Sequence, residues 1–245
     1  MNDFNENGYF IVPKFLTGKE CDDLIEESLN LSSCRSELSF DDLEYPYSSI
    51  GDFKRVERFL GGYQYTKRIK KIYEKNFTVY GKIPVDVTCE KIVLKSKYYG
   101  SYEPYHQESS YFKTGQEFFR FKQCVVALVD LDHCPINIFA GSHKLGEYEH
   151  HQIMERSGMS KFAISSNLLD ELSGFISLNL NRGDLLIMDF LLIHGSPSNS
   201  STIDQPRAIF RINDCNGSSD VLGRPVDRSR WEVDTLINIL HDRVK

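Results

Sequence analysis

Apolar residues along the chain follow two different periods, and the change falls about a third of the way along. Before it, TGKECDDLIEESLNL (17–31) has apolar residues at helical spacing, and it opens with Thr17 and Glu20, the pair typical of a capping box. QYTKRIKKIYEKN (64–76) shows the same spacing and predicts a second helix. Between them, residues 33–63 are rich in Ser, Asp, Tyr and Gly, and we expect either a lid over a pocket or a plain surface loop.

Downstream of Pro84 the pattern becomes that of β-strands. Short β-rich runs of apolar residues are separated by turn residues. We expect strands within 85–99, 121–131, 175–180, 185–196 and 206–214. A last amphipathic segment predicts a C-terminal helix over 229–243. This order favours a mainly β fold with flanking helices, either an antiparallel barrel or a double-sheet jelly roll.

Length and charge narrow the class of protein. A chain of 245 residues is within the range of one large domain. We predict a single domain over 1–245, with a helical N-terminal part over 1–80 and a β core over about 85–215. The formal net charge of -6 argues against nucleic acid as a bulk partner. No apolar stretch reaches the roughly 20 residues of a membrane helix, so we expect no membrane partner either.

The cysteines indicate the cellular compartment in which the protein works. The six cysteines are scattered and form no CxxC pair, which makes a zinc ribbon or a redox dithiol unexpected. The N-terminal MNDFNENGYF is acidic and polar, unlike a targeting leader. We therefore expect a soluble, reduced, cytoplasmic protein. The oligomeric state stays open.

Two histidines and a glutamate form the candidate metal site. In YHQESS (105–110), His106 and Glu108 are two residues apart after a strand-like run, so both side chains can point to one side. His194 ends the apolar run LLIMDFLLIH. Two imidazoles and a carboxylate inside a barrel make a facial triad, which holds Fe(II) and leaves coordination positions open. Each residue alone is weak evidence, and the signal comes from their combination with the residues downstream of His194.

Downstream arginines could hold an anionic co-reactant. Arg207 begins a predicted strand after His194, and a guanidinium binds a carboxylate through two parallel hydrogen bonds. The far carboxylate of 2-oxoglutarate, whose other end chelates iron, needs such a partner. Ser196 would face the same side as His194 and add a hydrogen bond. Arg211 shares the face of Arg207, so either arginine could serve; we favour Arg207.

These motifs resemble the phytanoyl-CoA dioxygenase family. The resemblance lies in YHQESSYF, FKQCVVALVDLDHCPINIFAGSHKLG and NRGDLLIMDFLLIHGSPSNSS…QPR, and covers roughly residues 90–213. It implies an Fe(II)- and 2-oxoglutarate-dependent dioxygenase on a double-stranded β-helix, a cupin-like jelly roll. It also implies metal binding by His106, Glu108 and His194, and cosubstrate binding by Arg207 with help from Ser196.

Two further features bear on the resemblance. Glu108 stands where the family usually has Asp; it is still a hard oxygen donor, and its presence argues against a halogenase, which needs that carboxylate missing. Lys95 and Lys97 lie where a family member often places a lysine, so one of them is a candidate for contact with the cosubstrate or with an acidic substrate. Solvated surface lysines are an equal alternative. We expect hydroxylation of a C–H bond of a small-molecule metabolite, with release of succinate and CO2.

Two other functions stay open at this point. A zinc-dependent hydrolase or isomerase on the same barrel could use the same three ligands, although it would have no use for a buried arginine. A non-catalytic jelly-roll binding protein would keep His106 and Glu108 as structural residues. The sequence does not identify the substrate or the position of oxidation.

Overall fold

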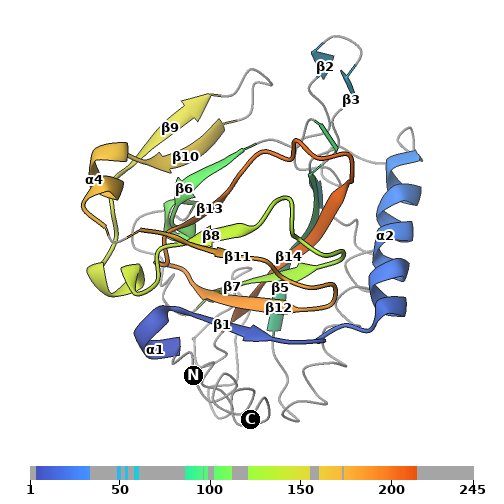
Figure 1. Cartoon of the computed structure of the whole chain (residues 1–245), viewed down its shortest axis with the longest axis horizontal. Coiled ribbons are helices and arrows are strands. Elements are labelled where there is room, and N and C mark those ends of the chain that lie inside the picture. Colours follow the sequence, from blue (N-terminus) through green and yellow to red (C-terminus); the bar gives the residue numbers. More distant parts are fainter. Residues whose placement is uncertain are drawn as a thin grey trace.

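Two stacked antiparallel sheets form the body of the protein in the computed structural model (Figure 1). The structure describes residues 4–33, 49–50, 53–54, 58–60, 86–95, 97–98, 102–111, 121–154, 160–172 and 174–213. The helices predicted at 64–76 and 229–243 lie outside these residues. No helix in these ranges is both long and apolar enough to cross a membrane. The two sheet layers confirm the predicted mainly β jelly roll.

The larger sheet has six strands in the order β1-β12-β7-β14-β5-β4. Their bounds, in that order, are Tyr9–Val12, Leu185–Asp189, Phe121–Ala127, Gln205–Asn213, Asp86–Lys95 and Arg58–Leu60. Every neighbouring pair is antiparallel. The chain therefore places β1, from near its N-terminus, beside β12 from much further along the sequence.

The smaller sheet has four strands in the order β11-β8-β13-β6. Their bounds are Ile176–Leu178, Ile136–Ile138, His194–Ser196 and Glu103–His106. Two separate hairpins pair β9 (His150–Met154) with β10 (Ser160–Ile164), and β2 (Ser49–Ile50) with β3 (Phe53–Lys54). The helices are α1 (Phe4–Asn7), α2 (Gly18–Ser33), α4 (Ser166–Asp170) and the short 3₁₀ turns η3 (Glu108–Tyr111) and η5 (Ser142–Leu145).

Alternation along the strands divides the larger sheet between two cores. On β7, Cys124 and Val126 belong to a buried cluster that includes Leu24 of α2. Val125, between them, belongs to a second cluster with Ile138 of the smaller sheet. Because successive strand residues point to opposite faces, the first cluster packs the outer face against α2 and the second fills the space between the sheets.

The predicted capping box at the start of α2 is confirmed. The backbone N–H of Thr17 donates to Oε2 of Glu20 at 2.9 Å, and the backbone N–H of Glu20 donates to Oγ1 of Thr17 at 3.2 Å. These bonds satisfy donors that a helix start leaves without partners. Leu24 is then fully buried on the inner face of the helix, which fixes α2 over the outer face of the larger sheet.

The two adjoining runs expected within 185–196 form two separate strands: β12 ends at Asp189 in the larger sheet, and β13 begins at His194 in the smaller sheet. The chain crosses between the layers at Phe190–Ile193, whose apolar side chains made the run look continuous. Within 33–63, β4 pairs with β5, so this part of the expected surface segment belongs to the larger sheet.

Candidate active site

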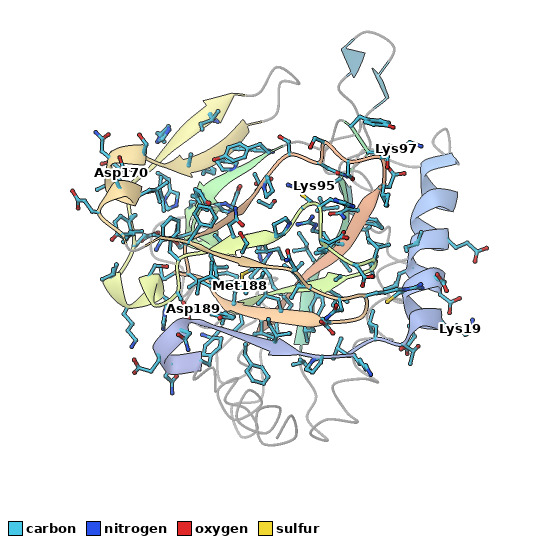
Figure 2. The ribbon with its side chains drawn as sticks, in the orientation of Figure 1. Lys19, Lys95, Lys97, Asp170, Met188 and Asp189 are labelled. Carbon is cyan, nitrogen blue, oxygen red and sulfur yellow. The ribbon has the colours of Figure 1, made fainter. Side chains whose placement is uncertain are left out.

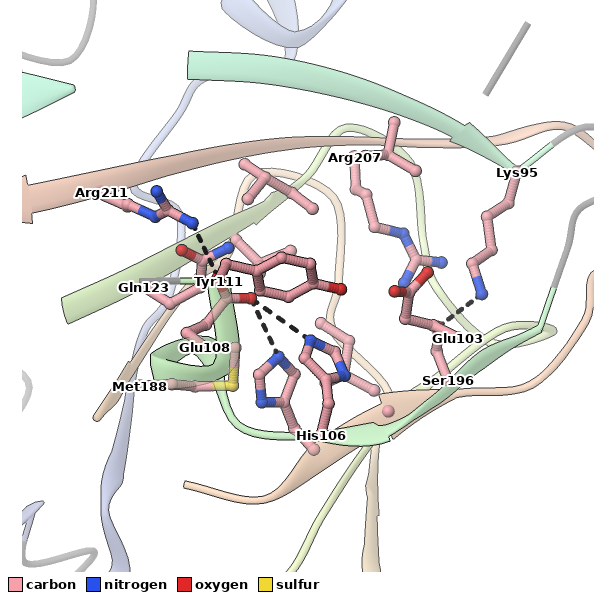
Figure 3. Close-up of a pocket in the computed structure, with 16 residues that line it drawn as sticks. Lys95, Glu103, His106, Glu108, Tyr111, Gln123, Met188, Ser196, Arg207 and Arg211 are labelled. Carbon is pink, nitrogen blue, oxygen red and sulfur yellow. Dashed lines mark hydrogen bonds and ion pairs between the residues drawn. The ribbon is translucent and has the colours of Figure 1, made fainter. Parts of the chain in front are cut away.

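A cavity of about 330 Å³ lies between the two sheets (Figure 3). Its walls come from the inner faces of β5, β7, β12 and β14 on one side, and of β6, β8 and β13 on the other. This volume is at the lower end of the range for small-molecule sites. The cavity contains all the candidate site residues named from the sequence except Lys97.

The three candidate metal ligands converge in this cavity. Nε2 of His106 is 3.5 Å, and Nε2 of His194 3.6 Å, from Oε1 of Glu108. All three side chains are buried, and one ligand atom of each lies within 4.8 Å of the others. His106 and His194 are direct partners across the β6–β13 ladder, so strand pairing itself brings the imidazoles together. Three donors held this closely around one point can bind a single metal ion.

Glu108 reaches this point by a route that strand alternation did not predict. His106 is the last residue of β6, and Glu108 opens the 3₁₀ turn η3 instead of continuing the strand. Gln107, between them, is fully buried. Its amide donates to the carbonyl oxygens of Gly146 and Leu191 and accepts from the N–H of Tyr148. These three bonds hold the turn that directs Glu108 inward, and the period-two reason for its orientation was wrong.

Backbone carbonyls fix which imidazole nitrogen faces the centre. Nδ1 of His106 lies 2.8 Å from the carbonyl oxygen of Pro104, and Nδ1 of His194 lies 3.0 Å from that of Leu192. A carbonyl oxygen can only accept a hydrogen bond, so in each ring Nδ1 carries the proton that it donates. In the neutral rings this leaves the lone pair on Nε2, the atom that points at Glu108.

The carboxylate is held in its ionised form. Burial alone would raise the pKa of Glu108, but the adjacent imidazoles of His106 and His194 and the charge of Arg211 outweigh it, so this pKa lies well below its usual value. Burial alone would lower the pKa of His106, but the adjacent Glu108 raises it. An ionised carboxylate is the form that binds a metal.

Arg211 contacts the second oxygen of the same carboxylate. Its Nη2 donates to Oε2 of Glu108 at 3.1 Å, and its guanidinium lies 5.5 Å from the ring centre of Phe190. The two oxygens of Glu108 therefore have different surroundings: Oε1 faces the histidines and Oε2 faces Arg211. Of the two arginines considered for the co-reactant, Arg211 is the one engaged with Glu108.

The other end of the cavity holds Lys95, Ser196 and Arg207. Nζ of Lys95 donates to Oγ of Ser196 at 2.5 Å. Nη2 of Arg207 donates to the carbonyl oxygen of Cys134 at 3.0 Å, whereas its buried Nε has no hydrogen-bond partner. Within the residues that the structure describes, no carboxylate lies within ion-pair distance of Lys95 or Arg207. Glu103, the acidic residue at this end, pairs with Lys161 at 3.2 Å.

Burial lowers the pKa of both Lys95 and Arg207. Burial, and then the charge of Arg207, lowers the pKa of Lys95 from 10.5 to about 8. Burial also lowers the pKa of Arg207. Lys97 does not share this environment, since β5 ends at Lys95 and Lys97 is exposed at the edge of the molecule (Figure 2). This end of the cavity therefore holds two buried cations beside the carboxylate of Glu103, whose charge acts on both of them.

The sequence reasoning missed two charged or amide residues of the cavity wall, Glu103 and Gln123. Gln123 lies on the inner face of β7, next to Arg211 across the β7–β14 ladder. The available signal was a single amide in FKQCVVAL, at the start of an otherwise apolar strand. Met188 of β12 also lines the cavity, and the same alternation places it on the inner face.

A model of the family phytanoyl-CoA dioxygenase (PhyH) matches residues 4–208. The chain belongs to the phytanoyl-CoA dioxygenase family. It is an Fe(II)- and 2-oxoglutarate-dependent dioxygenase, as the resemblance in its motifs implied. No curated protein matches the chain by sequence.

Solved structures share the fold at low sequence identity. EctD from S. alaskensis, crystallised with 2-oxoglutarate and 5-hydroxyectoine, is 15% identical with a TM-score of 0.65, over 94% of this chain and 79% of its own. EvdO2 from Micromonospora carbonacea var. aurantiaca is 15% identical with a TM-score of 0.62, over 85% and 87%. SnoK, a non-heme alpha-ketoglutarate-dependent carbocyclase from nogalamycin biosynthesis, is 13% identical with a TM-score of 0.62, over 91% and 90%. These similarities confirm the jelly-roll fold of this family member.

Proposed function

We propose that His106, Glu108 and His194 hold the iron of this dioxygenase, through Nε2, Oε1 and Nε2 respectively. The support is their convergence: three buried donors, two of them imidazoles with Nδ1 fixed by carbonyls, surround one point. Two imidazoles and one carboxylate are the ligand set that suits Fe(II) and leaves positions open for reactants. The residues present therefore fit a ferrous ion.

We further propose that Arg207 binds the distal carboxylate of 2-oxoglutarate, with Lys95 and Ser196 beside it. Two buried cations share this end with one carboxylate, Glu103, which also pairs with Lys161, so an anionic ligand would compensate the remaining positive charge. The unpartnered Nε of Arg207 is one donor still available for such a ligand. Arg211 is engaged with Glu108 instead, which supports Arg207 as the cosubstrate residue.

Iron and 2-oxoglutarate, when bound, would supply the oxidising chemistry together with dioxygen: one oxygen atom of O2 enters the succinate formed from 2-oxoglutarate with loss of CO2, and the other enters the hydroxylated C–H bond of the substrate. The chain contributes position and environment. Ionised Glu108 and the two oriented imidazoles would hold the metal ion. Lys95, Ser196 and Arg207 would hold the cosubstrate. Apolar walls that include Val125, Ile136 and Met188 keep bulk water from the reacting groups. A misplaced C–H bond would lower the rate steeply.

We propose a small-molecule metabolite as the substrate. A cavity of about 330 Å³ must accommodate both 2-oxoglutarate and the substrate, which favours a compact molecule. EctD was likewise crystallised with the small molecule 5-hydroxyectoine, and SnoK comes from nogalamycin biosynthesis. We also propose that residues 1–245 form one dioxygenase domain and that the protein works in the cytoplasm, where the free thiols of Cys21, Cys124 and Cys134 would stay reduced.

The direct test is turnover of the cosubstrate. Purified protein with Fe(II), ascorbate and 2-oxoglutarate should form succinate, and His194→Ala should abolish this. His133→Ala is the matched control, because His133 is exposed and does not line the cavity. Binding of Mn(II), followed by electron paramagnetic resonance, should fail in His194→Ala and persist in the control. Activity with zinc alone, or Mn(II) binding that survives His194→Ala, would refute the assignment.

A further inference from the structure

Gln123 is a buried polar group that the proposed metal and cosubstrate sites do not use. Gln123 is 3% exposed and lies on the inner face of β7. Its neighbour on the same face, Val125, is apolar. Oε1 of Gln123 has no hydrogen-bond partner. Burying an amide oxygen without a donor destabilises a fold, so a glutamine at this place calls for a reason beyond packing.

Figure 3 places Gln123 at the end of the cavity away from Lys95 and Arg207, with His106 and Glu108 between the two ends. Gln123 and Arg211 are direct partners across the β7–β14 ladder. Arg211 in turn lies 3.1 Å from Oε2 of Glu108. A group bound at Gln123 would therefore lie beside the candidate metal ligands, on the side opposite the proposed 2-oxoglutarate residues Lys95 and Arg207.

Gln205 is a second buried glutamine, and its hydrogen bonds differ from those of Gln123. Gln205 of β14 also has an Oε1 without a partner, but its Nε2 donates to the carbonyl oxygen of Asp130 and to Oδ1 of Asp132. Those two bonds explain Gln205 as a structural residue that tethers the 130–132 turn. Gln205 does not line the cavity. Gln123, in contrast, lines the cavity.

We propose that Gln123 is the substrate-recognition residue, and that the substrate carries an uncharged hydrogen-bond donor, an alcohol O–H or an amide N–H, on an aliphatic skeleton. This inference rests on the proposed function of the cavity. The buried Oε1 requires a donor. An ammonium donor is disfavoured because the neighbouring Arg211 is cationic and Gln123 carries no negative charge. Met188 and Val125, which line the same end, provide an apolar surface for the carbon skeleton.

The test uses matched small probes and protein loaded with Mn(II) and 2-oxoglutarate. The donor probes are 1,4-butanediol and N-methylbutyramide; their capped partners are 1,4-dimethoxybutane and N,N-dimethylbutyramide. Binding is followed by paramagnetic broadening of the probes' carbon-bound protons, which also shows that a probe lies near the metal. Wild-type protein should bind each donor probe roughly three- to tenfold more tightly than its capped partner, the difference expected of one hydrogen bond. n-Butylamine should bind no better than the capped probes.

Gln123→Met keeps the side-chain length but removes the acceptor, so it should abolish the preference for donors. Gln205→Met, the control, should retain it. Gln123→Met should also raise the melting temperature by roughly 2–4 °C, because it removes a buried polar group without a partner. Equal binding of donor and capped probes by wild-type protein, or an unchanged preference in Gln123→Met, would overturn the inference. Those results leave Mn(II) and 2-oxoglutarate binding intact, whereas loss of that binding would count against the proposed function itself.

Discussion

Replacing Arg207 by methionine should separate its role in binding from its effect on stability. Arg207 is 3% exposed, and its Nη2 donates to the carbonyl oxygen of Cys134. A cosubstrate carboxylate would add charge-assisted hydrogen bonds of about 1.5–3 kcal/mol each. Two such bonds give about 3–6 kcal/mol. Arg207→Met should therefore weaken 2-oxoglutarate binding at least roughly a hundredfold.

The stability of the same variant should change in the opposite direction. Arg207 is a buried cation without a carboxylate partner in the described residues, and methionine fills a similar volume without charge. We expect the ligand-free variant to be more stable by about 1 kcal/mol, or roughly 2–4 °C in melting temperature. A residue needed for the fold would show the reverse.

Isothermal titration of Mn(II)-loaded protein with 2-oxoglutarate, under nitrogen, measures the affinity. Mn(II) binding should stay within about threefold of wild type, because Arg207 contacts none of the three ligands. Arg182→Met is the matched control: this arginine also holds a carboxylate, that of Asp22 at 2.5 Å, but on the surface away from the cavity. A 2-oxoglutarate affinity within about threefold of wild type would refute the assignment of Arg207.

Three further residues offer tests of other parts of the molecule. Because the pKa of Lys95 is about 8, binding of 2-oxoglutarate should weaken as the pH rises through 8, and Lys95→Met should remove this dependence in titrations between about pH 6.5 and 9.5; a flat wild-type profile would contradict it. The unfolded chain keeps this proton up to about pH 10.5 and the folded chain loses it near pH 8, so the free energy of unfolding in urea should increase as the pH rises from 8 to 10.5, and Lys95→Met should remove this increase. Arg211→Lys keeps the charge but loses the planar donor that contacts Glu108, and should weaken Mn(II) binding about tenfold; unchanged affinity would show that Arg211 does not position the ligand. Thr17→Ala should lower the free energy of unfolding by about 1 kcal/mol by removing half of the capping box, measured by urea unfolding, and no loss would mean that the helix start is held by other contacts.

The residues of the site could be found from the sequence because they lie in or beside strands. His194 was located by the apolar run before it, and the period-two rule correctly placed Ser196 on the same side. The same rule placed Arg207 and Arg211 on one face of β14, and both line the cavity. Strand spacing is regular enough that one anchored residue predicts the direction of its neighbours.

The parts that could not be predicted depend on contacts far apart in the sequence. The turn that directs Glu108 inward is held by Gln107 bonding to residues about 40 and 84 positions away, and no local pattern encodes that. The crossing of the chain between sheets at 190–193 is similarly hidden, because residues at the crossing are as apolar as those in the strands. The engagement of Arg211 with Glu108 came only from the three-dimensional packing of β14 against η3.

The central claim concerns where the iron and the cosubstrate bind, and a crystal structure grown under nitrogen with Mn(II) and 2-oxoglutarate tests it most directly. We expect one metal ion bonded to Nε2 of His106, an oxygen of Glu108 and Nε2 of His194, with the far carboxylate of 2-oxoglutarate on Arg207. A metal ion bound elsewhere, or a cosubstrate carboxylate held by Arg211 instead, would contradict it.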